Sequence, residues 1–169
     1  MRYLRRSLTL LAAATLTAIA CQDAPTGLAP DQVPSASLLG GLTLASCTPL
    51  PADSVTQVVG PAGGVVVVGP HQLQVPAGAL DTLTSITAVA PSDNVNRVRF
   101  APEGLAFSPP ATITMSYANC ALAWWPIQRR IVYLDDLLTI LDVLPSALNG
   151  SSQTVSAPLH HFSNYAVAW

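Results

Sequence analysis

The feature that most constrains the fold is a series of short apolar or alternating segments that runs from Val55 to the end of the chain. Gly, Pro, Asn and Asp separate these segments at regular intervals. The pattern predicts strands at residues 55–59, 64–68, 71–75, 85–90, 95–100, 111–118, 131–134, 138–144, 153–157 and 163–169. Regularly spaced short strands are typical of β-sandwiches. We therefore expect an all-β fold, a single antiparallel β-sandwich over residues 55–169.

Several of these segments alternate clearly between apolar and polar residues, which predicts one buried and one solvated face. In residues 111–118, for example, Ile113 and Met115 oppose Thr112 and Thr114. The last segment alternates as well, and its larger side chains share one face of the expected strand: Tyr165, Val167 and Trp169. Its other face carries Asn164, Ala166 and Ala168. This pattern predicts a half-buried final strand.

Residues 135–144 are ambiguous, because four leucines also fit the stripe of an amphipathic helix: Leu137, Leu138, Leu141 and Leu144. Pro145 ends the run, and Asn149-Gly150 is a typical hairpin turn. We therefore interpret residues 138–144 as a strand, with Asp135-Asp136 in the turn before it.

The first twenty residues have the features of a secretory signal peptide. Three arginines near the N-terminus precede a run of apolar and small residues that ends at Ala20. This run is too short for a stable transmembrane helix, which needs about 20 apolar residues. We expect residues 1–20 to be removed and the protein to be exported.

Cys21 follows the expected cleavage site, and this arrangement resembles the lipobox of bacterial lipoproteins. The resemblance implies acylation of Cys21, although Ala18 and Ala20 would also serve as an ordinary signal-peptidase site. If Cys21 carries lipid, Cys47 and Cys120 remain as a pair, which suits a disulfide in an oxidising compartment. In some bacteria, an Asp directly after the lipidated Cys retains a lipoprotein in the inner membrane. Gln22 stands at this position, so we expect an outer-membrane lipoprotein of the cell envelope.

Residues 21–54 contain several prolines and no sustained periodicity, so we interpret them as a tether. Without the signal peptide, four Arg against nine Asp and Glu give a formal charge of −5. This balance argues against a nucleic-acid partner, because binding a phosphate backbone requires a basic face.

Three local patterns together resemble the ZU-5 domain, a module shared by zonula occludens scaffolds, uncoordinated-type netrin receptors and ankyrins. The first is Gly63-Gly64 with the segment at residues 73–80, and the second is the segment at residues 102–110. The third is His161-Phe162-Ser163. The resemblance covers residues 55–169 and implies a β-sandwich that binds other proteins.

In a subset of that family, the resemblance also implies self-cleavage between Phe162 and Ser163. The Ser163 hydroxyl would attack the Phe162 carbonyl, with His161 moving the proton. Such a reaction requires a strained backbone. The alternative is that His161 and Ser163 satisfy neighbouring backbone groups while Phe162 packs in the core.

The remaining candidate site is Trp124-Trp125, which would anchor a partner or stack on a sugar if exposed and would belong to the core if buried. The three histidines lack metal-ligand spacing, so no metal or other cofactor is expected. Our main hypothesis is a lipid-anchored interaction or structural module of the cell envelope, not an enzyme. Self-cleavage at Ser163 and carbohydrate binding by the two tryptophans are the alternatives.

Overall fold

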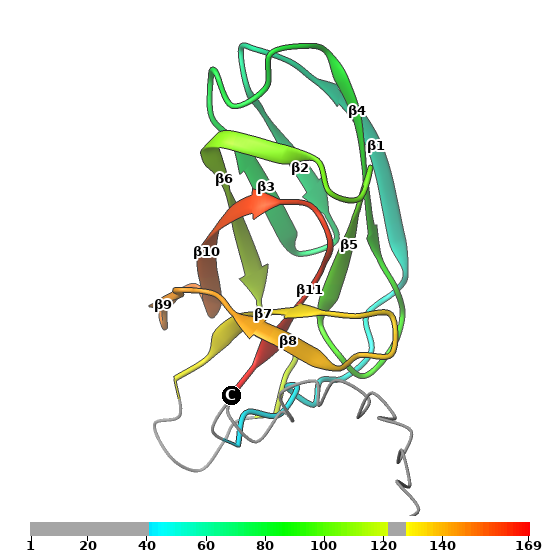
Figure 1. Cartoon of the computed structure of the whole chain (residues 1–169). Coiled ribbons are helices and arrows are strands. Elements are labelled where there is room, and N and C mark those ends of the chain that lie inside the picture. Colours follow the sequence, from blue (N-terminus) through cyan, green and yellow to red (C-terminus); the bar gives the residue numbers. More distant parts are fainter. Residues whose placement is uncertain (1–40, 122–127) are drawn as a thin grey trace, which may run out of the picture. The chain divides into compact units, whose positions relative to one another are not determined.

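The computed structural model describes residues 41–121 and 128–169, which form two antiparallel sheets packed as a β-sandwich (Figure 1). One sheet has six strands, in the order β1 (Asp53–Val59), β4 (Thr84–Ala90), β5 (Arg97–Ala101), β11 (Asn164–Ala168), β7 (Arg130–Leu134) and β8 (Ile140–Val143). The other has five strands, in the order β2 (Gly64–Val68), β3 (His71–Val75), β6 (Ala106–Ser116), β10 (Thr154–His161) and β9 (Ala147–Asn149). The predicted fold class is confirmed.

Each segment predicted to be a strand contains one, with ends that differ by a few residues. The ambiguous segment at residues 138–144 contains β8, so the strand interpretation is confirmed there. The prediction missed β9, whose three residues are all exposed. The Asn149-Gly150 turn joins β9 to β10, which pair in an antiparallel hairpin.

β6 begins five residues earlier than expected, because Pro109 and Pro110 lie within the strand and not before it. Proline cannot donate to a ladder and is confined to free edges or strand ends. On one side β3 pairs with β6 only at residues 112–114, so the two prolines lie where that edge has no partner.

The main core lies between the two sheets. It is built from alternate residues of each strand, as predicted for Ile113 and Met115, both fully buried. Three phenylalanines meet within it: the Phe162 ring stacks on Phe100 at 4.8 Å and meets the edge of Phe107 at 4.9 Å.

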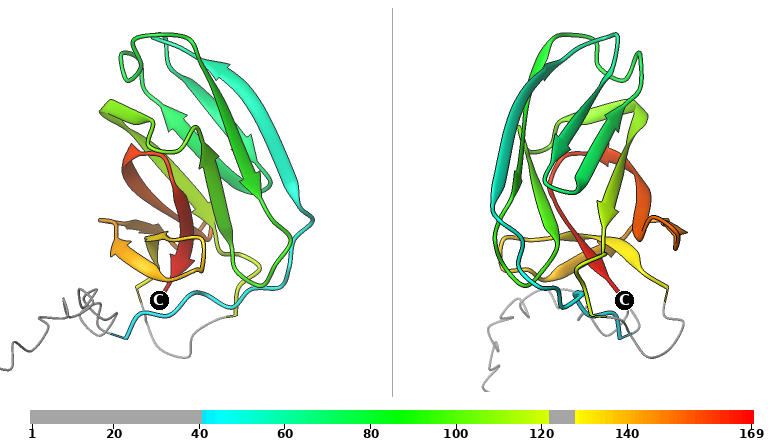
Figure 2. Two further views of the ribbon diagram at one scale, coloured as in Figure 1. Left: turned by 45° about the vertical axis from the view of Figure 1, so that its right-hand side comes forward. Right: turned by 180° about the vertical axis from the view of Figure 1, so that it is seen from behind.

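The prediction of a half-buried final strand is wrong, because β11 is buried on both faces. β11 lies in the interior of the six-stranded sheet, between β5 and β7 (Figure 2). On the outer face a second small apolar cluster forms around Ala166 and Ala168, together with Val132 and Leu134 of β7. Partly buried side chains from other segments pack against this cluster: Leu44, Val95, Leu138, Ile140 and Val143.

The sandwich also begins before residue 55, so the predicted end of the tether at residue 54 is too late. Thr43 and Trp169 exchange two backbone hydrogen bonds, and the Ala45 amide donates to Val167. This segment continues the ladder beside β11 beyond the end of β5, and Ala45 is fully buried. Residues 43–47 are too few to show a periodic pattern, so this pairing could not be predicted from the sequence.

Candidate functional site

An apolar groove of about 490 Å³ lies beside the start of β1. Three separate segments form its walls: Leu50, Pro51, Ala52 and Asp53, then Gly69 and Pro70, then Ser116, Ala118 and Asn119. The Asp53 carboxylate is already occupied, because it accepts the amides of Ser54 and Gly69 at 2.9 and 2.6 Å. We call this hollow the β1 groove.

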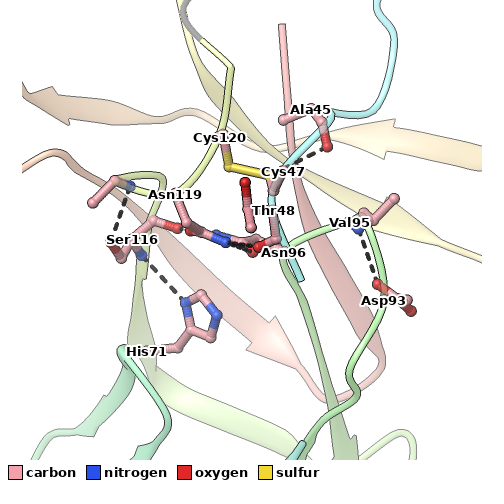
Figure 3. The surroundings of a disulfide bond; sticks show 11 residues. Ala45, Cys47, Thr48, His71, Asp93, Val95, Asn96, Ser116, Asn119 and Cys120 are labelled. Carbon is pink, nitrogen blue, oxygen red and sulfur yellow. Dashed lines mark hydrogen bonds between the residues drawn. A yellow bond between two sulfur atoms is a disulfide. The ribbon is translucent and has the colours of Figure 1, made fainter. Parts of the chain in front are cut away.

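The predicted disulfide joins two of these walls. Cys47 and Cys120 are bonded with an S–S distance of 2.08 Å, which confirms the predicted pairing (Figure 3). Cys47 lies three residues before Leu50, and Cys120 directly follows Asn119. Two backbone hydrogen bonds flank the disulfide, from Thr48 to Asn119 and from Ala121 to Ser46. The disulfide therefore holds the segment before β1 against the end of β6.

A pair of asparagine side chains supports the same junction (Figure 3). The buried Asn96 amide donates to the Ser116 carbonyl at 2.8 Å and to Asn119 Oδ1 at 2.7 Å. The Asn119 amide donates to the Thr48 carbonyl at 2.7 Å and back to Asn96 Oδ1 at 3.0 Å. Buried amides satisfied in this way order the backbone around them. Asn119 thus links this groove wall to two other segments, at Thr48 and Asn96.

His71 lies below this pair and is buried, with 3% of its surface exposed. Its Nδ1 atom accepts the Ser116 amide at 3.2 Å (Figure 3). Burial disfavours the charged ring and lowers the pKa of His71 to about 4. His71 is therefore neutral at physiological pH and acts as a hydrogen-bond acceptor within the core.

The β1 groove could not be predicted from the sequence, because its walls come from residues distant along the chain. The available signals were indirect. Pro49, Pro51 and Pro70 lie in or beside two walls, and an Asn precedes Cys120 in the third. None of these identifies a groove until the sheets are assembled.

The structure places His161-Phe162-Ser163 at the passage from β10 to β11. The Phe162 carbonyl oxygen accepts the Gly104 amide at 3.0 Å and lies 3.4 Å from His161 Nδ1. The Phe162 amide donates to the Leu105 carbonyl at 2.9 Å. The Glu103–Leu105 loop therefore fixes the peptide groups on both sides of Phe162.

Phe162 is fully buried and Ser163 is 5% exposed, whereas the His161 ring packs on Tyr133 at 5.6 Å near the surface. The Tyr165 hydroxyl donates to the His161 carbonyl at 2.7 Å. Among the described residues, the non-glycine residues with positive φ are Leu138 and Gln153, so neither Phe162 nor Ser163 has a left-handed backbone. The backbone of this turn is thus hydrogen-bonded at the His161 carbonyl and at both the amide and the carbonyl of Phe162.

The other predicted site residues, Trp124, Trp125 and Cys21, lie outside the described residues. Within residues 41–121 and 128–169, no group of three or more His, Cys, Asp or Glu is arranged to hold a metal ion. In the same ranges, no helix is long and apolar enough to cross a membrane.

A comparison with protein-family models found no match, and no curated protein matches the sequence. The resemblance to the ZU-5 domain therefore stays a prediction that rests on its three local patterns.

Proposed function

We propose that this protein is an exported binding module of the cell envelope, anchored by lipid on Cys21. In this proposal, the β1 groove holds an apolar segment of a partner protein. The observation that carries the proposal is the groove itself, a hollow of about 490 Å³ with largely apolar walls. Concave apolar sites of this size are the usual places for ligands in proteins.

The chemistry of the walls supports an uncharged apolar ligand. The Asp53 carboxylate already accepts two backbone amides, and Asn119 is committed to Asn96 and Thr48. Few polar groups remain to fix a polar ligand. Burial of apolar side chains would then supply most of the binding energy, at about 25 cal/mol per Å².

The disulfide supports the proposed compartment. Disulfides persist in oxidising environments such as the periplasm and the extracellular space. The Cys47–Cys120 bond is consistent with export, as the basic and apolar first twenty residues also suggest.

Site-specific crosslinking tests this proposal. A photoreactive residue in place of Ala52 or Ala118, in the full chain exported to the envelope, should give a discrete protein adduct. Ala62 is the matched control, because it is an exposed alanine outside the groove, in the turn between β1 and β2. Absence of an adduct at both groove positions, or the same adduct from position 62, would reject the proposal.

A second candidate function is self-cleavage between Phe162 and Ser163, favoured by the contacts of the Phe162 carbonyl. A carbonyl oxygen that accepts an amide from Gly104 and faces His161 Nδ1 resembles an oxyanion site. Attack by Ser163 Oγ on the Phe162 carbonyl carbon would break the C–N bond and form an ester. The hydroxyl proton would pass to the released amine, and water would then hydrolyse the ester.

The intact mass of the denatured protein distinguishes this candidate. Cleavage would release a peptide of residues 163–169, and Ser163→Ala would abolish the release. A full-length C-terminus in the wild-type protein after prolonged incubation would exclude the reaction and leave the turn with a structural role.

A further inference from the structure

The five-stranded sheet differs from the six-stranded sheet in charge. None of its strands, β2, β3, β6, β9 and β10, contains an Asp, Glu, Lys or Arg. The six-stranded sheet carries charged residues on four of its strands, at Asp53, Arg97, Arg99, Arg130 and Asp142. The strands of the five-stranded sheet therefore carry no Asp, Glu, Lys or Arg on their outer face.

The side chains on this face form rows across the strands. In one row Val65 pairs with Gln74, and Gln74 pairs with Thr112. All three side chains are exposed. In the next row, Gln72 pairs with Thr114, whose hydroxyl is hydrogen-bonded to Ser156 at 2.8 Å. Adjacent rows lie about 7 Å apart, and adjacent strands about 4.8 Å.

The side chains in these rows suit a neutral ligand that donates and accepts hydrogen bonds. Gln amides and Thr hydroxyls each donate and accept hydrogen bonds, as sugar hydroxyls do. Val65 and Val67, on the edge strand β2, are 38% and 54% exposed and offer apolar contact to the C–H faces of a sugar ring. No Arg or Lys lies on these strands to attract an anionic polymer.

The size of the face suits a linear polymer. Five strands at about 4.8 Å and five residues at about 3.4 Å define a projected area of about 400 Å². A second copy of the chain would bring a like net charge. A linear polymer needs only a strip of surface, so the area suffices for it.

We infer that the outer face of the five-stranded sheet binds a neutral polysaccharide laid across its strands. This site is separate from the β1 groove, so the two proposals succeed or fail independently. Together they would let one domain hold a partner protein and an envelope polysaccharide.

Affinity electrophoresis of the full chain tests the inference. Native gels contain hydroxyethylcellulose or galactomannan as neutral polymers, or polygalacturonate as an anionic one. Each protein is compared with itself in a gel without polymer, which removes the effect of its own charge. We expect retardation by at least one neutral polymer and none by polygalacturonate. Retardation by neither neutral polymer, or by polygalacturonate alone, would overturn the inference.

Two variants locate the site. Gln74→Arg places a charge within the face and should lose the retardation, whereas Ser85→Arg is the matched control on an exposed position of β4 in the other sheet. If Gln74→Arg lowers the melting temperature, the double variant Gln72→Ala/Gln74→Ala removes two amides without adding charge and should also lose the retardation. Unchanged retardation in a folded variant of this face, or equal loss in Ser85→Arg, would place binding elsewhere and overturn the inference.

Discussion

Within residues 41–121 and 128–169, three of the five buried polar residues lie together beside the disulfide: His71, Asn96 and Ser116. Each is hydrogen-bonded, which is the general condition for polar groups in a core. His71 deserves a physical test because its contact depends on the neutral ring. From the sequence, His71 shows only that it lacks the spacing of a metal ligand. Its burial at the first residue of β3 depends on the packed sheets.

We predict that His71 makes stability fall as the solution becomes acidic. Its pKa in the folded protein is about 4, below the value of about 6.5 expected in the unfolded chain. Below pH 6.5 the unfolded chain therefore binds a proton that the folded protein does not, and stability is lost between pH 6.5 and 4. The full loss corresponds to about 3 kcal/mol.

Urea unfolding at pH 7 and pH 4.5 measures this effect. His71→Gln keeps an acceptor for the Ser116 amide but cannot be protonated, so its stability should depend less on pH. His160→Gln, on an exposed histidine of β10, should behave like the wild-type protein. Equal pH dependence in all three proteins would contradict the prediction.

At the level of the elements, β11 departs most from its sequence pattern. Alternation of larger and smaller side chains predicted one solvated face, yet Ala166 and Ala168 are fully buried on the outer side. The cover comes from segments far away in the sequence, including Leu44 and Val95. By contrast, the polar residues of the alternating segments β3 and β5 include exposed ones, at Gln72, Gln74 and Arg99.

We therefore predict that Ala166→Asp is severely destabilising. It would place a carboxylate in the second apolar cluster, where the cross-strand neighbour Arg97 is already paired with Asp93 at 2.8 Å, and the expected loss is about 3 kcal/mol or more. Ser85→Asp is the control, since Ser85 is exposed on the same face of the same sheet and should change stability by about 0.5 kcal/mol or less. Guanidinium unfolding measures both. Similar midpoints for the two variants would show that the outer face of β11 is open to solvent.

At the level of the whole molecule, the Cys47–Cys120 disulfide closes a long loop, with a sequence separation of 73 residues. Most of the sandwich lies within this loop, and both ends of it contribute walls to the β1 groove. The bond therefore restricts the unfolded chain and also fixes the groove.

We predict that removing the disulfide costs about 4 kcal/mol, from the entropy of closing a loop of this length. The double variant Cys47→Ser/Cys120→Ser and the reduced wild-type protein should show similar losses in thermal or denaturant unfolding. Crosslinking from position 118 should weaken in both, because the groove walls lose their covalent link. Unchanged stability after complete reduction would contradict the prediction.

The sequence alone determined the strand pattern, the sandwich class, the two faces of strands such as β6, and the pairing of Cys47 with Cys120. These follow from local alternation along a pleated strand and from counting thiols. Only the tertiary structure decided that β11 is buried on both faces, that residues 43–47 belong to the sandwich, and that three segments enclose the β1 groove. The tertiary structure also decided that the Gly104 amide donates to the Phe162 carbonyl. The physical reason is that pleating is a property of neighbouring residues, whereas cover and contact depend on chain segments brought together from far apart.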